Sequence, residues 1–255
     1  MKNALITGAS GGIGLAITKQ LATEGTRLML VARSVDRLKE IVTTLPGSDH
    51  QFLQMDLSLQ NDIDELASHI SEQNYDVLFN NAGVVLYGRF DEIDLEQQLK
   101  MLTLNCNALV TLAYAFLRQA RSGGALVNIS SVLGFSSFPG AAAYAGTKGF
   151  VVRFSESLYY EYKSRDVYVM ALCPGVTATN FHIAAGSSHD EYPGIIVQTP
   201  EQVAKETLTA LKKRKKPVVI CGIMNRSMLL FQRFLGRKQV VNMMGRVSPV
   251  KKSNA

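Results

Sequence analysis

Tyr144 and Lys148 are the residues of this chain whose types and spacing most directly suggest acid–base chemistry. Their separation of four positions puts both side chains on one face of a helix. A free tyrosine has a pKa of about 10 and is a poor catalyst at neutral pH, but a nearby ammonium lowers that pKa. The pair alone is a weak signal, because many helices contain one by chance. Ser131 ends a strand candidate thirteen positions earlier, at the sheet edge where α/β folds bind ligands.

A glycine-rich segment follows the first apolar run of the chain and precedes the first helical pattern. Glycines at such a place let the backbone turn sharply and approach a pyrophosphate, which the amides and dipole of the helix N-terminus attract. Taken alone, the segment is explained equally well as an ordinary loop. Its position between a strand and a helix favours a dinucleotide site formed by Gly8, Ser10, Gly12, Ile13 and Gly14.

Arg33 and Arg37 bear on the choice of dinucleotide. The end of the second strand in such folds contacts the adenosine ribose: an acidic residue binds the 2′-hydroxyl of NAD, and an arginine accommodates the 2′-phosphate of NADP. This chain has Arg33 and no carboxylate at that strand end. Arg37, one helical turn later, is a second candidate for the phosphate. The alternative for both residues is a solvated surface arginine.

Short apolar segments alternate with longer segments of helical period along most of the chain. This alternation predicts βαβ units and a doubly wound, Rossmann-type parallel sheet of about seven strands with helices on both faces. The predicted strands are 4–7, 27–32, 51–55, 77–80, 125–130, 167–173 and 217–221, and the predicted helices are 12–24, 35–45, 60–72, 95–120, 144–163 and 200–211. We expect a catalytic domain over residues 1–222 and a basic amphipathic extension over 223–255, either part of that domain or peripheral to it.

Taken together, these motifs resemble those of the short-chain dehydrogenase/reductase family, in its NADP-preferring branch. The glycine turn is similar to the family's cofactor fingerprint, and its Asn-Asn-Ala-Gly motif is matched by residues 80–83. The family's Ser…Tyr-x-x-x-Lys arrangement and its catalytic asparagine are matched by Ser131, Tyr144, Lys148 and Asn105. The residues Pro174-Gly175 and Thr179 match its motif under the nicotinamide. Five short motifs in the right order and spacing make the resemblance specific.

The resemblance implies a catalytic role for four residues. Tyr144 would donate a proton to a carbonyl oxygen, while Lys148 would lower the tyrosine pKa and hold the nicotinamide ribose. Ser131 would hydrogen-bond the substrate oxygen. Asn105 would hold a water molecule that links Lys148 to solvent.

The resemblance also implies a cofactor site for NADP(H). Tyr144 and Lys148 belong to it, and its other residues would be Asp56 and Leu57 at the adenine, Asn81, Ala82 and Gly83 on the adenosine side, and Pro174, Gly175, Thr177 and Thr179 at the nicotinamide end. One position departs from the pattern. Many NADP-preferring members carry a basic residue just before the second fingerprint glycine, where this chain has Gly11, which weakens the NADP assignment without reversing it.

Charge is distributed unevenly over the chain, whose net charge is +6. Residues 212–255 hold 12 Lys plus Arg and no Asp or Glu, whereas residues 1–211 carry 15 basic against 21 acidic side chains. The apolar residues of 223–247 recur at helical spacing between the basic ones. This segment could lie on an anionic membrane surface, cover the substrate cleft or pack in a subunit interface. No recognised nucleic-acid-binding motif accompanies the charge, so we expect no nucleic-acid partner.

Composition excludes some classes of protein. With 47% hydrophobic and 19% charged residues, the chain is not expected to be disordered. Three widely spaced cysteines indicate neither a disulfide framework nor zinc, and no histidine pair has metal-ligand spacing, so we expect no metal site. Without a disulfide framework, the simplest location is the reducing cytoplasm, possibly at the periphery of a membrane. The first apolar run is too short for a signal peptide, and no apolar stretch approaches the roughly 18 residues of a membrane span.

The function predicted from these residues is NADP(H)-dependent reduction of a ketone to a secondary alcohol, or the reverse. We expect an apolar substrate, for which a 3-oxoacyl chain is one option, and the family resemblance implies a homodimer or homotetramer. The long connection 177–199 is a candidate lid, although its His182 and His189 are better explained as loop residues without a task. The alternative from another class is a non-enzymatic NADP(H)-binding sensor or scaffold.

Overall fold

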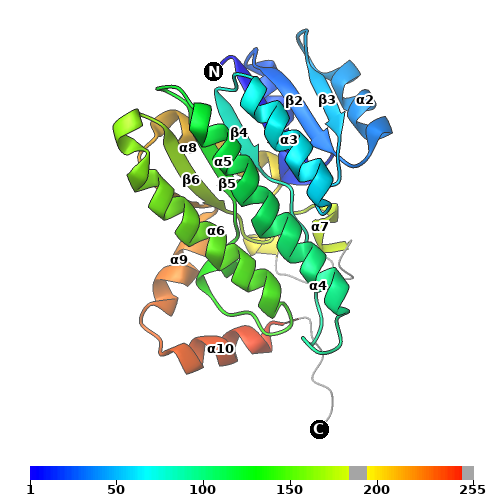
Figure 1. The fold of residues 1–255 in the computed structure, drawn as a ribbon. Coiled ribbons are helices and arrows are strands. Elements are labelled where there is room, and N and C mark those ends of the chain that lie inside the picture. Colours follow the sequence, from blue (N-terminus) through cyan, green and yellow to red (C-terminus); the bar gives the residue numbers. More distant parts are fainter. Residues whose placement is uncertain (184–193, 249–255) are drawn as a thin grey trace.

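The strands of the computed structural model, which describes residues 1–183 and 194–248, form one seven-stranded parallel sheet (Figure 1). The strand order is β3-β2-β1-β4-β5-β6-β7, so the direction of winding reverses between β1 and β4. The strands are β1 (Asn3–Thr7), β2 (Arg27–Ala32), β3 (Gln51–Gln54), β4 (Val77–Asn80), β5 (Ala125–Ile129), β6 (Tyr168–Cys173) and β7 (Val218–Ile220). The predicted doubly wound fold is confirmed.

Helices cover both faces of the sheet because consecutive residues of its strands point to opposite sides. Along β1, Ile6 joins the core on one face and Leu5 the core on the other. The first face is covered by α1 (Gly12–Thr23), α2 (Val35–Thr44) and α8 (Pro200–Lys213). The second is covered by α3 (Gln60–Glu72), α5 (Leu109–Gln119) and α6 (Ala142–Glu161).

The predicted helix over residues 95–120 is interrupted by a π-helical turn. It consists of α4 (Leu95–Leu102), the π turn Thr103–Ala108 and α5. A π turn inserts an extra residue into the helical ladder and often marks a functional site. Because such an insertion leaves no clear mark on hydrophobic periodicity, the sequence predicts only an ordinary helix here.

The same stretch, Leu95–Gln119, is the one helix among the described residues long and apolar enough to cross a membrane by length and composition. This differs from the expectation that no apolar stretch approaches the length of a membrane span. Nearly half (44%) of its most apolar window is buried inside the protein, where α5 packs against α3 and the sheet. A core helix meets the same criteria, so the stretch is weak evidence for a membrane span.

The C-terminal segment continues past β7 as α9 (Ile223–Gln232) and α10 (Arg237–Arg246), which lie below the sheet in Figure 1. Both helices contact the connection between β5 and α6. The Ser136 hydroxyl donates to Gln232 Oε1 of α9 at 2.5 Å, and a Cβ atom on Gly245 of α10 would lie 3.5 Å from Pro139. Just after α10, the Ser248 hydroxyl donates to the Pro139 carbonyl at 2.7 Å. The boundary at residue 222 stays a prediction, but the segment beyond it packs on the catalytic part of the chain.

Candidate active site

The glycine turn between β1 and α1 has the backbone geometry that a phosphate group needs. Gly8 and Gly12 have φ angles of +65° and +52°, which favour glycine. A Cβ atom on Gly14 would overlap the Gly8 carbonyl oxygen, so a side chain does not fit there. The N-terminus of α1 has no side-chain cap and no acidic residue in its first turn. Its amides and positive dipole end therefore suit the pyrophosphate of a dinucleotide.

Asn81 ties this turn to the end of β4, across the point where the winding reverses. Its Nδ2 donates to the carbonyls of Thr7 at 2.9 Å and Gly8 at 3.1 Å. The Thr7 hydroxyl in turn accepts from the amides of Asn81 and Ala82, both at 3.0 Å. The side chain and amide of Asn81, together with the Ala82 amide, thus hold the glycine turn in place.

The structure distinguishes the two arginines proposed for the adenosine end. Arg33 is exposed and makes no side-chain hydrogen bond or ion pair within the described part of the chain. Arg37 is paired with Glu40, three residues later, at 2.5 Å. Arg33 is therefore free to bind a phosphate, whereas Arg37 would first have to leave its carboxylate.

Asp56 is held in its charged form close to Arg33. Burial raises its pKa, but hydrogen bonds from the Ser58 amide and hydroxyl, with the positive charges of Arg33 and Lys100, outweigh burial and lower it. The Ser58 hydroxyl donates to Asp56 Oδ1 at 2.7 Å. Leu57, the next residue, is buried. The carboxylate of Asp56 is thus positioned by its own loop.

Ser131, Tyr144 and Lys148 lie together at the carboxyl edge of the sheet. Ser131 ends the connection from β5 and caps a short 3-10 helix, accepting from the Leu133 amide at 3.1 Å. Tyr144 and Lys148 are both buried on α6, with Lys148 Nζ 5.6 Å from the centre of the tyrosine ring. The predicted spacing therefore does bring the three side chains to one place.

The pKa of Tyr144 differs from the sequence-based expectation. Burial raises it above its ordinary value, and the opposing influence is the hydrogen bond with Ser131 rather than the charge of Lys148. The Lys148 ammonium donates to the Ile129 carbonyl at 2.9 Å. Without a cofactor, then, Tyr144 keeps its proton across the neutral range.

Asn105 lies in the π turn and is almost fully buried. Its Nδ2 donates to the Val84 carbonyl at 2.9 Å and to the Thr147 hydroxyl at 3.3 Å, and its Oδ1 accepts from the Val84 amide at 3.0 Å. The side chain is thus occupied in joining α6 to the segment after β4. A Cβ atom on Gly83 would lie 3.1 Å from Asn105 Oδ1, a tight approach, and 3.5 Å from Lys148 Nζ, an ordinary contact, so glycine here mainly leaves room for Asn105.

The loop after β6 completes the site. Its backbone at Pro174 accepts from the Val132 amide at 2.9 Å, which joins it to the Ser131 segment. A Cβ atom on Gly12 would lie 3.2 Å from the Thr179 methyl group, so this loop also reaches the glycine turn. Thr177 is buried and donates to the Gly175 carbonyl at 3.1 Å. The predicted nicotinamide-end residues therefore lie between the glycine turn and Ser131.

Comparison with known proteins agrees with this geometry. The family model described as short chain dehydrogenase matches residues 2–190, which is more than half of the chain.

The chain belongs to the short-chain dehydrogenase family.

Two curated relatives and one solved structure illustrate the similarity. A 3beta-hydroxysteroid dehydrogenase of Mediterraneibacter gnavus is 31% identical over 181 residues, which cover 69% of this chain and 66% of the relative. A very-long-chain 3-oxoacyl-CoA reductase of Rattus norvegicus is 34% identical over 186 residues, covering 69% and 59%. The matches thus span less than two thirds of either relative. A short-chain dehydrogenase from Sphingobium yanoikuyae in complex with NADPH has a TM-score of 0.80 and 29% identity, covering 100% and 98% of the two chains.

Around Tyr144, this short-chain dehydrogenase has an apolar wall that the sequence did not reveal. Tyr144 clusters with Val85, Met101, Phe138 and Met244, and the Phe181 ring centre lies 6.2 Å from its own. Met244 comes from α10, a hundred residues away in sequence. Of the two loop histidines considered, His189 lies outside the described residues, and nothing is described of the His182 side chain.

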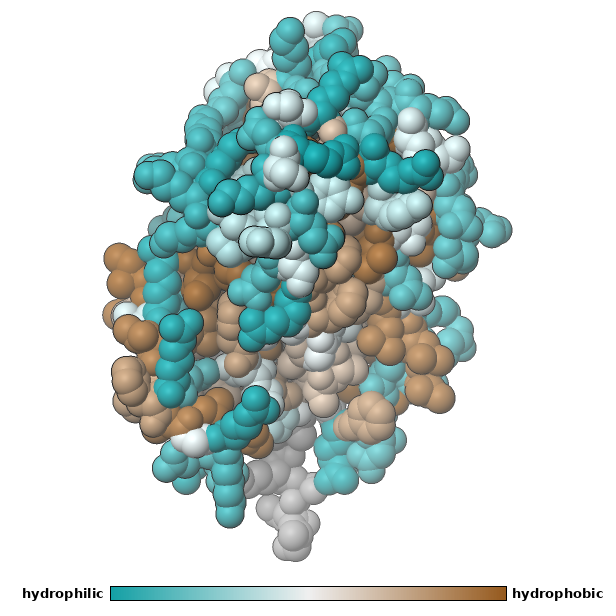
Figure 2. All heavy atoms as spheres, turned by 60° about the vertical axis from the view of Figure 1, so that its left-hand side comes forward, coloured by the Kyte–Doolittle hydropathy of each residue, from teal (hydrophilic) through white to brown (hydrophobic). Residues whose placement is uncertain are grey.

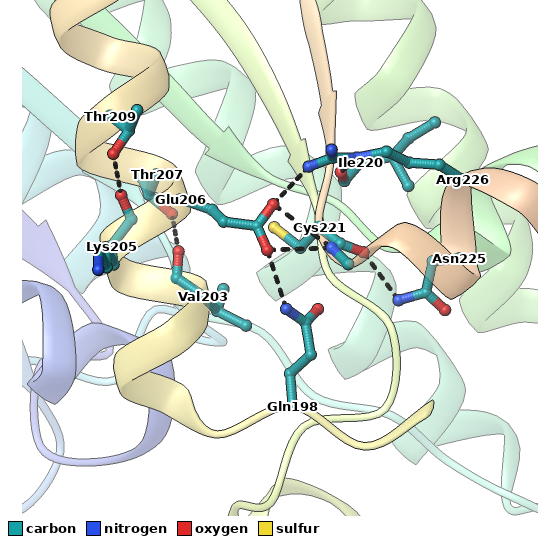
Figure 3. A network of polar contacts seen from close by, with 11 residues as sticks. Gln198, Val203, Lys205, Glu206, Thr207, Thr209, Ile220, Cys221, Asn225 and Arg226 are labelled. Carbon is teal, nitrogen blue, oxygen red and sulfur yellow. Dashed lines mark hydrogen bonds and ion pairs between the residues drawn. The ribbon is translucent and has the colours of Figure 1, made fainter. Parts of the chain in front are cut away.

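Glu206 of α8 is a second feature that sequence motifs missed (Figure 3). Its carboxylate accepts from Gln198 Nε2 at 3.0 Å and the Gly222 amide at 3.1 Å, and it pairs with Arg226 at 2.5 Å. Gln198 exchanges backbone hydrogen bonds with Val176 and Ala178 of the nicotinamide-end loop. Glu206 therefore links that loop to the start of α9.

Asn225 of α9 contacts the same loop directly. It donates to the Cys221 carbonyl at 2.8 Å and is buried against Gly175, where a Cβ atom would overlap the Asn225 amide group. Glycine at position 175 is thus required by the close approach of α9. No local pattern in the sequence signals such a contact between segments fifty residues apart.

Lys148 gives a prediction on stability and pH. Burial lowers its pKa to about 8 from 10.5. Below pH 8 both folded and unfolded chains carry the charge, so burial costs the fold its full penalty. Between pH 8 and 10.5 only the unfolded chain is protonated, and the penalty of roughly 3 kcal/mol fades. We expect urea unfolding without cofactor to show Lys148→Met more stable than wild type near pH 7, with the advantage shrinking toward pH 10. A pH-independent difference would contradict this.

Glu206 gives a prediction on the fold. Glu206→Ala leaves the Gly222 amide, Gln198 and Arg226 without their acceptor, so we expect the free energy of unfolding to fall by about 2 kcal/mol. The matched control is Glu96→Ala, which breaks an exposed pair with Lys100 at 2.7 Å and should cost less than about 0.5 kcal/mol. Urea denaturation of both variants checks the difference. Equal small losses would show that the network contributes nothing.

Proposed function

We propose that this chain is an NADP(H)-dependent carbonyl reductase that converts an apolar ketone to a secondary alcohol. The observation that carries the proposal is the grouping of half-buried Ser131 with buried Tyr144 and Lys148, next to an uncapped helix N-terminus at the reversal of the sheet. A hydroxyl, a protonated phenol and an ammonium gathered beside a dinucleotide turn match the needs of carbonyl reduction.

In this mechanism the side chains bind the carbonyl oxygen and supply its proton. The bound cofactor supplies hydride chemistry. Ser131 donates a hydrogen bond to the carbonyl oxygen and so polarises the bond. Tyr144, whose pKa is raised by burial, holds its proton at neutral pH and gives it to the same oxygen as charge develops there. The Lys148 ammonium, charged below pH 8, stabilises the phenolate that remains. A Tyr144 that holds its proton at neutral pH is in the form that reduction requires.

The preference for NADP(H) rests on Arg33. It is exposed, unpaired within the described residues and placed after β2, and no carboxylate competes for a 2′-hydroxyl at that strand end. The Sphingobium relative was solved with NADPH, which is consistent with this choice. The other proposed cofactor residues are those of the glycine turn, the Asn81 segment, Asp56, Leu57 and the loop from Pro174 to Thr179.

The substrate class follows from the apolar wall around Tyr144. Side chains such as Phe138, Phe181 and Met244 favour a ketone with an extended apolar body over a small polar one. The two named relatives are a hydroxysteroid dehydrogenase and a 3-oxoacyl-CoA reductase, whose names indicate apolar substrates. We further propose that the protein is a homo-oligomer. Its three cysteines are free, which is consistent with a reducing cytoplasm.

Tyr144→Phe tests the chemistry. The variant keeps the ring in its apolar wall but removes the proton donor, so we expect the turnover number to fall by about 100-fold or more. NADPH binding, followed by cofactor fluorescence, should stay within about twofold. Activity near the wild-type level would refute the proposed acid. Loss of NADPH binding as well would show that the variant damages the site rather than the proton transfer.

Arg33→Asp tests the cofactor preference. A carboxylate there repels the 2′-phosphate and can accept from a 2′-hydroxyl, so the KM for NADPH should rise at least about tenfold while that for NADH is unchanged or falls. Arg37→Asp is the matched control, and its effect should be smaller because Arg37 is already paired with Glu40. Equal effects of Arg33→Asp on the two cofactors would remove the argument for a 2′-phosphate site.

A further inference from the structure

Helix α9 buries two amide side chains against the protein and exposes most of its apolar side chains to solvent. Asn225 and Gln232 are only 7% and 8% exposed, whereas Ile223 and Phe234 are 76% and 80% exposed. Leu230, Phe231 and Met224 are exposed as well. A surface helix of a globular protein has the opposite arrangement. The outward face of α9 therefore suits an apolar environment.

This orientation is fixed by contacts of the inward face. Asn225 donates to the Cys221 carbonyl at 2.8 Å and packs on Gly175. Gln232 accepts from the Ser136 hydroxyl at 2.5 Å, and Leu229 between them is buried. Rotating α9 to bury its aromatic rings would break both polar contacts. The exposed apolar residues thus belong to a helix held in one orientation.

The exposed apolar residues of α9 form one arc. At 100° per residue, Ile223, Met224, Leu230 and Phe231 fall within about 120° of one another, with Ser227 between them. Phe234 follows in the turn after the helix. Arg226 and Arg233 fall together along one edge of this arc. Space-filling Figure 2 shows apolar surface gathered in the lower half of the molecule, where α9 and α10 lie in Figure 1, while the upper half is mostly hydrophilic.

Charge decides which partner fits this face. Residues 212–255 contain 12 basic and no acidic side chains, and Arg233, Arg237 and Lys238 are exposed beside the apolar arc. A second copy docked by the same face would set two such basic surfaces against each other, which like-charge repulsion opposes. An anionic lipid surface offers both an apolar interior and negative headgroups.

We propose that α9 and the start of α10 form a peripheral membrane-binding face for anionic lipid. Phe231 and Phe234 enter the boundary between headgroups and acyl chains, and Arg233, Arg237 and Lys238 contact the negative headgroups. The inference does not depend on the proposed reaction, because neither the residues nor the test below involves turnover.

Vesicle sedimentation tests the proposal with the full chain. We expect binding to phosphatidylcholine vesicles that contain phosphatidylserine, at least about tenfold weaker binding to pure phosphatidylcholine, and release by high salt. Phe231→Ser with Phe234→Ser, and separately Arg233→Gln, Arg237→Gln and Lys238→Gln together, should each weaken binding at least about tenfold. Tyr160→Ser, which removes a ring 81% exposed on α6, is the control and should bind as wild type.

Three results would overturn the proposal. The first is no binding by wild type to the phosphatidylserine vesicles, and the second is undiminished binding by both sets of variants. The third is a lower molecular mass of the Phe231→Ser, Phe234→Ser variant by light scattering with vesicle binding unchanged, which would assign the face to a second copy. Far-UV circular dichroism and NADPH binding confirm that each variant is folded.

Discussion

The site depends on the burial of one ammonium group at the carboxyl edge of the sheet. Lys148 Nζ is out of contact with water and bonded to the Ile129 carbonyl, and its neighbours are arranged around that constraint. Gly83 leaves room for Asn105, which lies in the π turn and joins α6 to the adjoining segment. Burying a charge costs stability unless the charge is paired and hydrogen-bonded, and desolvation dominates at Lys148. Here the purpose we propose is to hold a positive charge beside the phenol of Tyr144.

A second set of contacts makes the C-terminal segment part of the same site. Glu206 and Asn225 connect α8 and α9 to the loop that runs from Gly175 to Thr179, and Met244 of α10 packs in the cluster around Tyr144. Segments on both sides of the last strand therefore position the nicotinamide-end loop, and α10 contributes to the apolar wall. The inward face of α9 makes these contacts with the site, whereas its outward face and basic edge make none of them and are available for another interaction.

Sequence reasoning predicted the strands and helices well because buried parallel strands and amphipathic helices have strong periodic signals. It also selected Ser131, Tyr144 and Lys148, since four-residue spacing fixes a helix face and the end of a strand fixes a sheet edge. It did not predict the π turn, which the hydrophobic period barely registers. Asn225, Glu206 and Met244 were missed because their contacts join distant segments. The raised pKa of Tyr144 was missed because burial, rather than the spacing to lysine, dominates it.

The central claim is that this short-chain dehydrogenase reduces a carbonyl group with NADPH. The most direct measurement is NADPH oxidation by the wild-type protein against a panel of apolar ketones, including steroid and 3-oxoacyl compounds, with the alcohol product quantified in parallel. The account predicts turnover on at least one such ketone, with one alcohol formed for each NADPH consumed. Tight NADPH binding without turnover across the panel would contradict it and favour a dinucleotide-binding sensor.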